Sequence, residues 1–289
     1  MASALVVLGM TSACEPSRPA PPPSTSQSNS SMPLFRSTLS PPAANRAESP
    51  SLDAELPGVP GEAASRGLLL ARPHAPRVAA PRAARVPLGL TDANDAFHAR
   101  DGFVYVPNGI DANVPSPLVV FFHGAGGNAG QAEMIRRVAE NHHALVLAID
   151  SRGPTWDLIH DELGPDVAFL DRALRWTFDR FAVDPAHVAT AGFSDGASYA
   201  VSIGLANGEL FGTVLAFSPG FSAAPEIHGK PRFFISHGTK DAVLPIDPCS
   251  RRMVKALTRA GYDVDYREFD GPHTVPAEIT RDAFAWLLG

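Results

Sequence analysis

The stretch "AGFSDGAS", residues 191–198, places a serine between two glycines that lie two positions away on either side. The residues that lead into it, "HVATAGF" (187–193), have the composition of a buried strand, and "GASYAVSIGLAN" (196–207) is typical of a helix rich in small residues. A nucleophilic serine on a sharp strand-to-helix turn needs small neighbours, because the strand and the helix approach each other closely there. We therefore predict that Ser194 is a nucleophile.

Strands and helices alternate on both sides of this stretch. The predicted strands are 67–71, 101–107, 117–123, 144–150, 212–218, 232–238 and 263–269, and the predicted helices are 131–143, 166–181, 248–262 and 276–288. Continuous apolar runs such as "PLVVFFH" (117–123) are typical of strands that are buried on both faces. The alternation predicts a mostly parallel sheet with helices on both faces and an antiparallel edge at its start, with an irregular connection between 71 and 101. In such folds the chemistry lies beyond the carboxyl ends of the strands.

Two later loops supply the partners that a serine nucleophile needs. Asp241 follows the strand "RFFIS" in "SHGTKDAVLP", and His273 follows the last strand in "DGPHTVP". A serine hydroxyl is a poor nucleophile without a base, so His273 is the predicted base and Asp241 the acid that orients it. Asp247 is a weaker candidate for the acid because it is placed to cap a helix. Asp270 is too close to His273 in the same loop for a well-aimed hydrogen bond.

A glycine-rich loop, "FFHGAGGNAG" (121–130), follows the predicted strand 117–123 and is a candidate for binding a developing oxyanion. Its glycines allow backbone N–H groups to face one point. We assign the oxyanion hole to the N–H groups of Ala125 and Asp195, with Gly126 in reserve and as a pocket candidate. His123 is expected to brace this loop and not to act as a catalyst.

The loop "DSRGPTWD" (150–157) also follows a strand and should border the active site. Its Trp156 either forms a wall of the substrate pocket or packs inside the loop, and the sequence leaves both alternatives open. His237 ends a strand and is expected to order the acid loop. The connection between 218 and 232 is too short for a cap domain, which predicts an open site suited to short acyl groups or to esters presented on a larger body.

Taken together, "PLVVFFHGAGGNAG", "AGFSDGASYA", "SHGTKDAVLP" and "GPHTVP" resemble the α/β-hydrolase serine esterases. The chain looks most like the phospholipase/carboxylesterase (acyl-protein thioesterase-like) group. It is also similar to polyhydroxybutyrate depolymerase-like and feruloyl esterase-like secreted enzymes. The resemblance covers residues 66–289. It implies an α/β-hydrolase fold without a cap domain, a carboxylesterase-type serine hydrolase activity and no need for a cofactor or a metal.

The N-terminal quarter of the chain has a different composition. Residues 1–14 contain a short apolar run and then small residues before Cys14, which is similar to a bacterial lipoprotein signal with Cys14 as the lipidated residue. Residues 15–65 are rich in proline and serine and predict a disordered tether that leads to a catalytic domain over 66–289. These features predict a secreted or lipid-anchored extracytoplasmic protein that can attach to a membrane through Cys14.

Composition narrows the function further. The 289 residues carry a net charge of −6 with no basic stripe, which argues against a nucleic acid partner. Two cysteines, Cys14 and Cys249, do not suggest a disulfide framework or a metal site. The resemblance to serine esterases implies a small-molecule or polymeric ester as the substrate. The alternatives are a serine peptidase on the same fold and a non-catalytic surface lipoprotein that retains the fold for binding.

Overall fold

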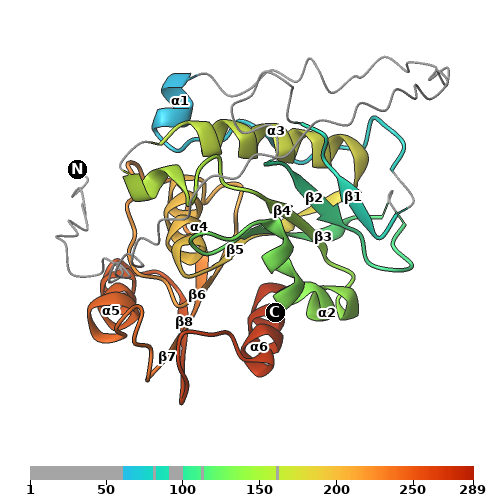
Figure 1. The fold of residues 1–289 in the computed structure, drawn as a ribbon. Helices are drawn as coiled ribbons and strands as arrows, with labels where there is room; N and C mark the ends of the chain where they lie inside the picture. The colour runs from blue at the N-terminus through green and yellow to red at the C-terminus, as the bar shows by residue number, and fades with distance from the viewer. Residues whose placement is uncertain (1–60, 81–82, 91–99, 112–113, 161–162) are drawn as a thin grey trace, which may run out of the picture.

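An eight-stranded β-sheet organises the part of the chain that the computed structural model describes, which is residues 61–80, 83–90, 100–111, 114–160 and 163–289 (Figure 1). The strands are β1 (Arg85–Pro87), β2 (Gly102–Tyr105), β3 (Ser116–Phe122), β4 (Leu145–Ile149), β5 (Val183–Phe193), β6 (Thr213–Phe217), β7 (Arg232–Gly238) and β8 (Val264–Phe269). Their order across the sheet is β1-β2-β4-β3-β5-β6-β7-β8. The pairs β1–β2 and β2–β4 are antiparallel, and all the other pairs are parallel. The predicted mostly parallel sheet with an antiparallel edge is confirmed.

Helices cover both faces of this sheet (Figure 1). They are α1 (Gly61–Ser65), α2 (Glu133–Asn141), α3 (Pro165–Arg180), α4 (Asp195–Ala206), α5 (Arg252–Arg259) and α6 (Ala277–Leu288), with short helical turns η2 (Ala129–Ala132), η3 (Asp157–His160) and η4 (Asp247–Arg251). Side chains of α1, α3, α4 and α5 join one buried apolar cluster, and those of α2 and α6 join the other. Because both faces are covered, strands such as β4 and β6 are buried along their whole length, and all their residues except Thr213 are apolar.

The spacing of apolar residues explains why α3 forms where it does. Val167, Leu170, Leu174 and Phe178 lie on one side of this helix, and all four are buried in the cluster that packs on the sheet. Pro165 occupies the first turn, where its missing N–H leaves no hydrogen bond unmade. The predicted helix over 166–181 is thus confirmed within one residue at each end.

The predicted strand at 67–71 is wrong. The backbone N–H groups of this stretch are not bonded to a neighbouring strand: those of Gly67 and Leu68 donate to carbonyl oxygens of α1, and the next three donate to side chains. Leu70 and Ala71 both donate to Asp171 Oδ1 on α3 at 2.7 Å, and Leu69 donates to Asn207 Oδ1, at the end of α4, at 2.8 Å. The apolar pattern "GLLLA" therefore reports burial of Leu69 and Ala71 against helices.

Two other boundaries differ from the sequence-based expectation. The edge strand β1 lies inside the stretch expected to be irregular, because it pairs with β2 across three residues. The predicted tether runs to residue 65, yet Gly61–Ser65 forms α1 and Ala64 is buried, so this segment is part of the folded unit. The predicted signal segment, the rest of the tether and Cys14 lie outside the described residues. Within the described ranges, no helix has the length and apolar character needed to cross a membrane.

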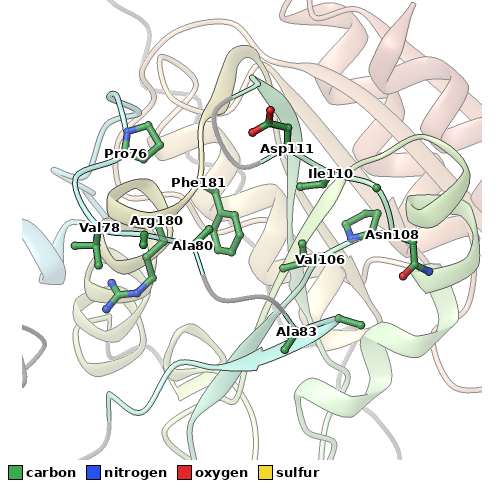
Figure 2. A pocket seen from close by; sticks show the side chains of 14 residues that line it. Pro76, Val78, Ala80, Ala83, Val106, Asn108, Ile110, Asp111, Arg180 and Phe181 are labelled. Carbon is green, nitrogen blue, oxygen red and sulfur yellow. The ribbon is translucent and has the colours of Figure 1, made fainter. Parts of the chain in front are cut away.

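A cavity of about 810 Å³ lies at the amino ends of the parallel strands (Figure 2). Val106, which follows the antiparallel strand β2, and Phe181, which comes just before β5, are among the residues that line it. Parallel strands carry their site-forming loops at the carboxyl ends, so this cavity lies at the opposite edge of the sheet from Ser194. It is separate from the site described next.

Candidate active site

Ser194 lies at the turn between β5 and α4, as predicted. Its backbone has φ 58° and ψ −123°, a conformation that costs a non-glycine residue about 1–3 kcal/mol. Its own N–H donates to Phe217 O at the end of β6 at 3.0 Å, which fixes the turn against the neighbouring strand. A Cβ at Gly192 would lie 2.2 Å from Gly196 O, and a Cβ at Gly196 would lie 2.1 Å from Phe122 O. Only glycine fits at these two positions, because the end of β5 lies against the first turn of α4 and that turn lies against the end of β3.

His273 and Asp241 meet at the same edge of the sheet. His273 Nδ1 donates to Asp241 Oδ2 at 2.5 Å, and the Asp241 side chain is fully buried. The other carboxylate oxygen of Asp241 accepts hydrogen bonds from the N–H groups of Val243 at 2.9 Å and Leu244 at 2.8 Å. Both oxygens are held, so the carboxylate has one orientation. Because Nδ1 carries the hydrogen of the neutral ring, Nε2 of His273 is left as the basic nitrogen.

The imidazole of His273 packs next to the serine turn. The ring of Phe193, the residue before Ser194, lies 4.6 Å from the His273 ring between centroids. No hydrogen bond joins Ser194 Oγ to His273 in the described part of the chain. Such contacts are often long in unliganded enzymes and shorten when substrate binds. The geometry brings together the three residues that the sequence singled out.

The rival acids take other partners. Asp247 and Asp270 are exposed, with side chains 78% and 75% accessible, and they pair with Arg251 at 2.9 Å and with Lys240 at 2.7 Å. The sequence-based choice of Asp241 over these two is therefore consistent with the geometry.

In the glycine-rich loop after β3, most of the N–H groups are already used. Gly124 donates to Gln131 Oε1 at 2.6 Å, Gly126 to Pro154 O at 2.8 Å and Gly127 to Gly124 O at 3.0 Å. The N–H of Ala125 has no acceptor among the described residues, and the loop is exposed there. Gly126, the reserve donor, is therefore occupied by Pro154.

This loop also lies against the nucleophile turn. A Cβ at Gly124 would lie 3.3 Å from Ser194 Cβ, so Ala125 follows a residue that contacts the serine. Asp195 is the first residue of α4, where a helix leaves its N–H groups unpaired. Its N–H has no acceptor in the described chain either. Ala125 and Asp195 thus present two available N–H donors close to the serine turn.

His123 braces the loop, as expected. It is fully buried, its Nδ1 donates to Gly124 O at 2.7 Å, and its Nε2 accepts the N–H of Ser151 at 3.0 Å. Burial lowers the pKa of His123 below its usual range, which keeps the ring neutral and this pair of bonds intact.

The loop after β4 borders the site, but Trp156 is not part of a pocket wall. Its side chain is 0% exposed, stacks on Tyr199 with ring centroids 4.7 Å apart, and donates its indole N–H to His123 O at 2.8 Å. Core packing, the second alternative, is therefore the one observed. The loop instead contacts the site through Thr155, whose hydroxyl donates to Asp195 Oδ2 at 2.8 Å.

Sequence reasoning missed Thr155, Gln131 and Ser250 as supporting residues. Gln131 holds the glycine-rich loop through Gly124, and Ser250 contacts His237 from η4. Each is a common polar residue without a motif of its own. These residues are recognised only by their contacts in the folded structure, so no signal in the sequence could have identified them.

The sequence of this chain is similar to those of curated feruloyl esterases. A feruloyl esterase C from Emericella nidulans is 26% identical over 167 residues, which cover 55% of this chain and 61% of that protein. A probable feruloyl esterase C from Aspergillus oryzae is 27% identical over 157 residues, 51% of this chain and 57% of that protein. The chain thus matches little more than half the length of these curated relatives. No family model matches it.

Solved structures of esterases superpose on this chain and identify its fold. Esterase PE8 superposes with a TM-score of 0.54 at 24% identity, covering 65% of this chain and 98% of that one. A CE1 ferulic acid esterase from Anaeromyces mucronatus superposes with a TM-score of 0.53 at 19% identity, covering 72% of this chain and 90% of that one. The chain has the α/β-hydrolase fold. Its connection between β6 and β7, residues 218–231, contains no helix, so no cap domain is inserted there.

Proposed function

We propose that this protein is a serine carboxylic-ester hydrolase that acts through an acyl-enzyme. The observation that carries the proposal is the 2.5 Å hydrogen bond from His273 to the buried Asp241, beside a serine on a strained strand-to-helix turn. A binding protein has no need for three strand-end residues in catalytic order. The likeness to proteins named as feruloyl esterases supports the same reaction class.

In the proposed mechanism, Ser194 Oγ attacks the ester carbonyl carbon while His273 Nε2 takes its proton. Asp241 keeps the ring in the Nδ1–H tautomer and stabilises the imidazolium that forms. The oxygen of the tetrahedral intermediate receives hydrogen bonds from the N–H groups of Ala125 and Asp195. His273 then protonates the leaving alcohol. A water molecule, activated in turn by His273, hydrolyses the acyl-enzyme and releases the acid.

The proposed substrates are esters of short acyl groups or esters presented on a larger body, including feruloyl-type aromatic esters. The open edge supports this proposal, because residues 218–231 form no helical cover over the site. Export and attachment to a membrane through Cys14 remain predictions from the N-terminal sequence.

The test is hydrolysis of p-nitrophenyl esters from acetate to palmitate, together with methyl ferulate, by the full chain and by Ser194→Ala. We expect turnover to fall beyond butyrate and to drop by at least about 10³-fold in Ser194→Ala, because removal of the nucleophile leaves only binding and the oxyanion hole. A fluorophosphonate probe should label the native chain and not the variant.

Ser236→Ala is the matched control, because it removes a buried serine whose hydroxyl has no partner among the described residues. It should keep full turnover and labelling. Substantial turnover in Ser194→Ala would reject the assignment of the nucleophile. A native chain that is folded but neither turns over esters nor takes the probe would favour the non-catalytic alternative, and cleavage of peptides in preference to esters would favour the peptidase.

A further inference from the structure

A second histidine contacts the same carboxylate oxygen of Asp241 that receives the hydrogen bond of His273. His237, near the end of β7, is fully buried, and its Nε2 lies 3.2 Å from Asp241 Oδ2 and 2.8 Å from Leu244 O. Its Nδ1 lies 2.6 Å from Ser250 Oγ, and Ser250 is buried as well. His237 therefore joins the acid loop to η4 through both of its ring nitrogens.

The partners of His237 determine its tautomer. A carbonyl oxygen and a carboxylate oxygen can only accept, so Nε2 must carry a hydrogen, shared between Leu244 O and Asp241 Oδ2. Burial lowers the pKa of His237 below its usual range, so the ring is neutral and its Nδ1 has a lone pair. The hydroxyl of Ser250 donates to that lone pair. A bond from Ser250 thus keeps the hydrogen on the nitrogen that faces Asp241.

The charged groups around His237 come from three directions. Asp241 is on the loop that follows β7, His273 is on the loop after β8, and Glu268 on β8 acts on His237 through its charge. Glu268 is paired with Arg251 of η4 at 2.6 Å, which offsets its negative charge. The group that faces His237 most directly is therefore the Asp241 carboxylate.

We infer that His237, held as the Nε2–H tautomer by Ser250, is a positioning residue that restrains the Asp241 carboxylate and limits the negative charge it presents to His273. The inference rests on the proposed function. With two donors on Oδ2 and the N–H groups of Val243 and Leu244 on Oδ1, the carboxylate cannot rotate away from His273. The second donor also shares the charge of Oδ2, which would otherwise be directed at His273 alone.

The experiment compares the pH dependence of kcat/KM on p-nitrophenyl acetate for the full chain, His237→Leu, His237→Gln and Ser250→Ala. His237→Leu removes the donor while filling most of the space. We expect kcat/KM on its plateau to fall about tenfold or more, the effect of losing one hydrogen bond to a charged group. Its acid limb should move to higher pH, because an unshared carboxylate charge favours protonation of the catalytic base.

His237→Gln keeps an N–H near the position of Nε2, so it should return the acid limb toward that of the native enzyme. Ser250→Ala leaves the ring in place and removes only the bond that selects its tautomer. It should shift the limb in the same direction as His237→Leu and lower kcat/KM by about three- to tenfold. This variant tests the inference even if His237→Leu does not fold. Ser236→Ala, on the neighbouring residue of β7, is the control and should match the native profile.

The outcomes separate the two proposals. An unchanged acid limb in folded Ser250→Ala and His237→Leu, with lower thermal stability alone, would overturn the positioning role and leave the esterase proposal intact. An equal shift in His237→Gln and His237→Leu would also overturn it, because the retained N–H would then have no effect. A native chain without ester turnover would overturn the proposed function and, with it, this inference.

Discussion

At the scale of single residues, the active site depends on glycine at position 196, where a Cβ atom would clash with the backbone. Gly196 is in the first turn of α4, where alanine would favour the helix by about 1 kcal/mol. A Cβ at this position, however, would lie 2.1 Å from Phe122 O and 2.5 Å from His123 O, both backbone atoms of β3 and its following loop. Backbone in a central strand cannot move aside as a flexible side chain can, so packing outweighs helix propensity here.

We therefore expect Gly196→Ala to lower the free energy of unfolding by about 2 kcal/mol or more and to reduce ester turnover, since the clash moves Ser194 relative to Ala125. Urea unfolding followed by circular dichroism measures the first effect and p-nitrophenyl acetate hydrolysis the second. Gly212→Ala is the control. A Cβ there meets only Ala186 O at 3.7 Å, an ordinary contact, so this variant should differ from the native chain by less than about 1 kcal/mol. Equal effects of the two substitutions would contradict this reading.

At the scale of elements, side chains of α3 and of the end of α4 take the place of a strand partner for residues 69–71. Asp171 on α3 is fully buried and accepts the N–H groups of Leu70 and Ala71, while Arg175 donates to its other oxygen at 2.7 Å. This one carboxylate fastens the segment to α3, and the amide of Asn207 fastens it to α4.

Asp171→Ala should destabilise the fold by about 2–3 kcal/mol, because it leaves two N–H groups without an acceptor in a largely buried place. Asp171→Asn keeps one oxygen for both N–H groups and loses the charge and the acceptor that face the partly exposed Arg175, so its destabilisation should be clearly smaller. Hydrogen exchange of the Leu70 and Ala71 amides, measured beside the unfolding free energy, localises the effect. Slow exchange of both amides in Asp171→Ala would show that the segment is held by other contacts.

At the scale of the whole molecule, the change of stability with pH depends on a buried acidic pair, Asp157 and Asp166. Burial, and then the charge of Asp157, raises the pKa of Asp166 to about 7. In the unfolded chain an aspartate titrates near pH 4. Between about pH 4 and about pH 7 the folded state therefore binds more protons at this site than the unfolded state, and its contribution to stability falls as the pH rises through this window. His123 and His237, whose pKa values are lowered by burial, act in the opposite sense.

The effect of Asp166 is isolated by comparison with Asp166→Asn. The unfolding free energy of the native chain, relative to that of the variant, should decrease by an amount on the order of a few kcal/mol between about pH 4 and about pH 7. Urea titrations at several pH values in this range measure the difference. Parallel pH curves for the two proteins would show that Asp166 does not titrate in the window.

Much of this architecture could be predicted because its patterns are local. The apolar runs of β3, β4 and β6 and the spacing of buried residues on α3 report two covered faces directly. Ser194, Asp241 and His273 could be chosen because each directly follows a predicted strand, and the carboxyl ends of parallel strands share one edge. The strand predicted at 67–71 failed because an apolar run records burial but not the partner that receives the backbone hydrogen bonds.

The sequence by itself determined the fold class, the position of three distant residues directly after predicted strands, and the small neighbours that the serine turn requires. Only the tertiary structure decided that Trp156 is packed in the core, that Ala125 and not Gly126 has an available N–H, and that His237 shares the oxygen of Asp241 with His273. The physical reason is the separation along the chain of the residues that determine each feature. Burial and turn geometry depend on residues within a few positions, whereas a hydrogen-bond partner such as Ser250 or Pro154 is set by how separate loops meet at the edge of the sheet.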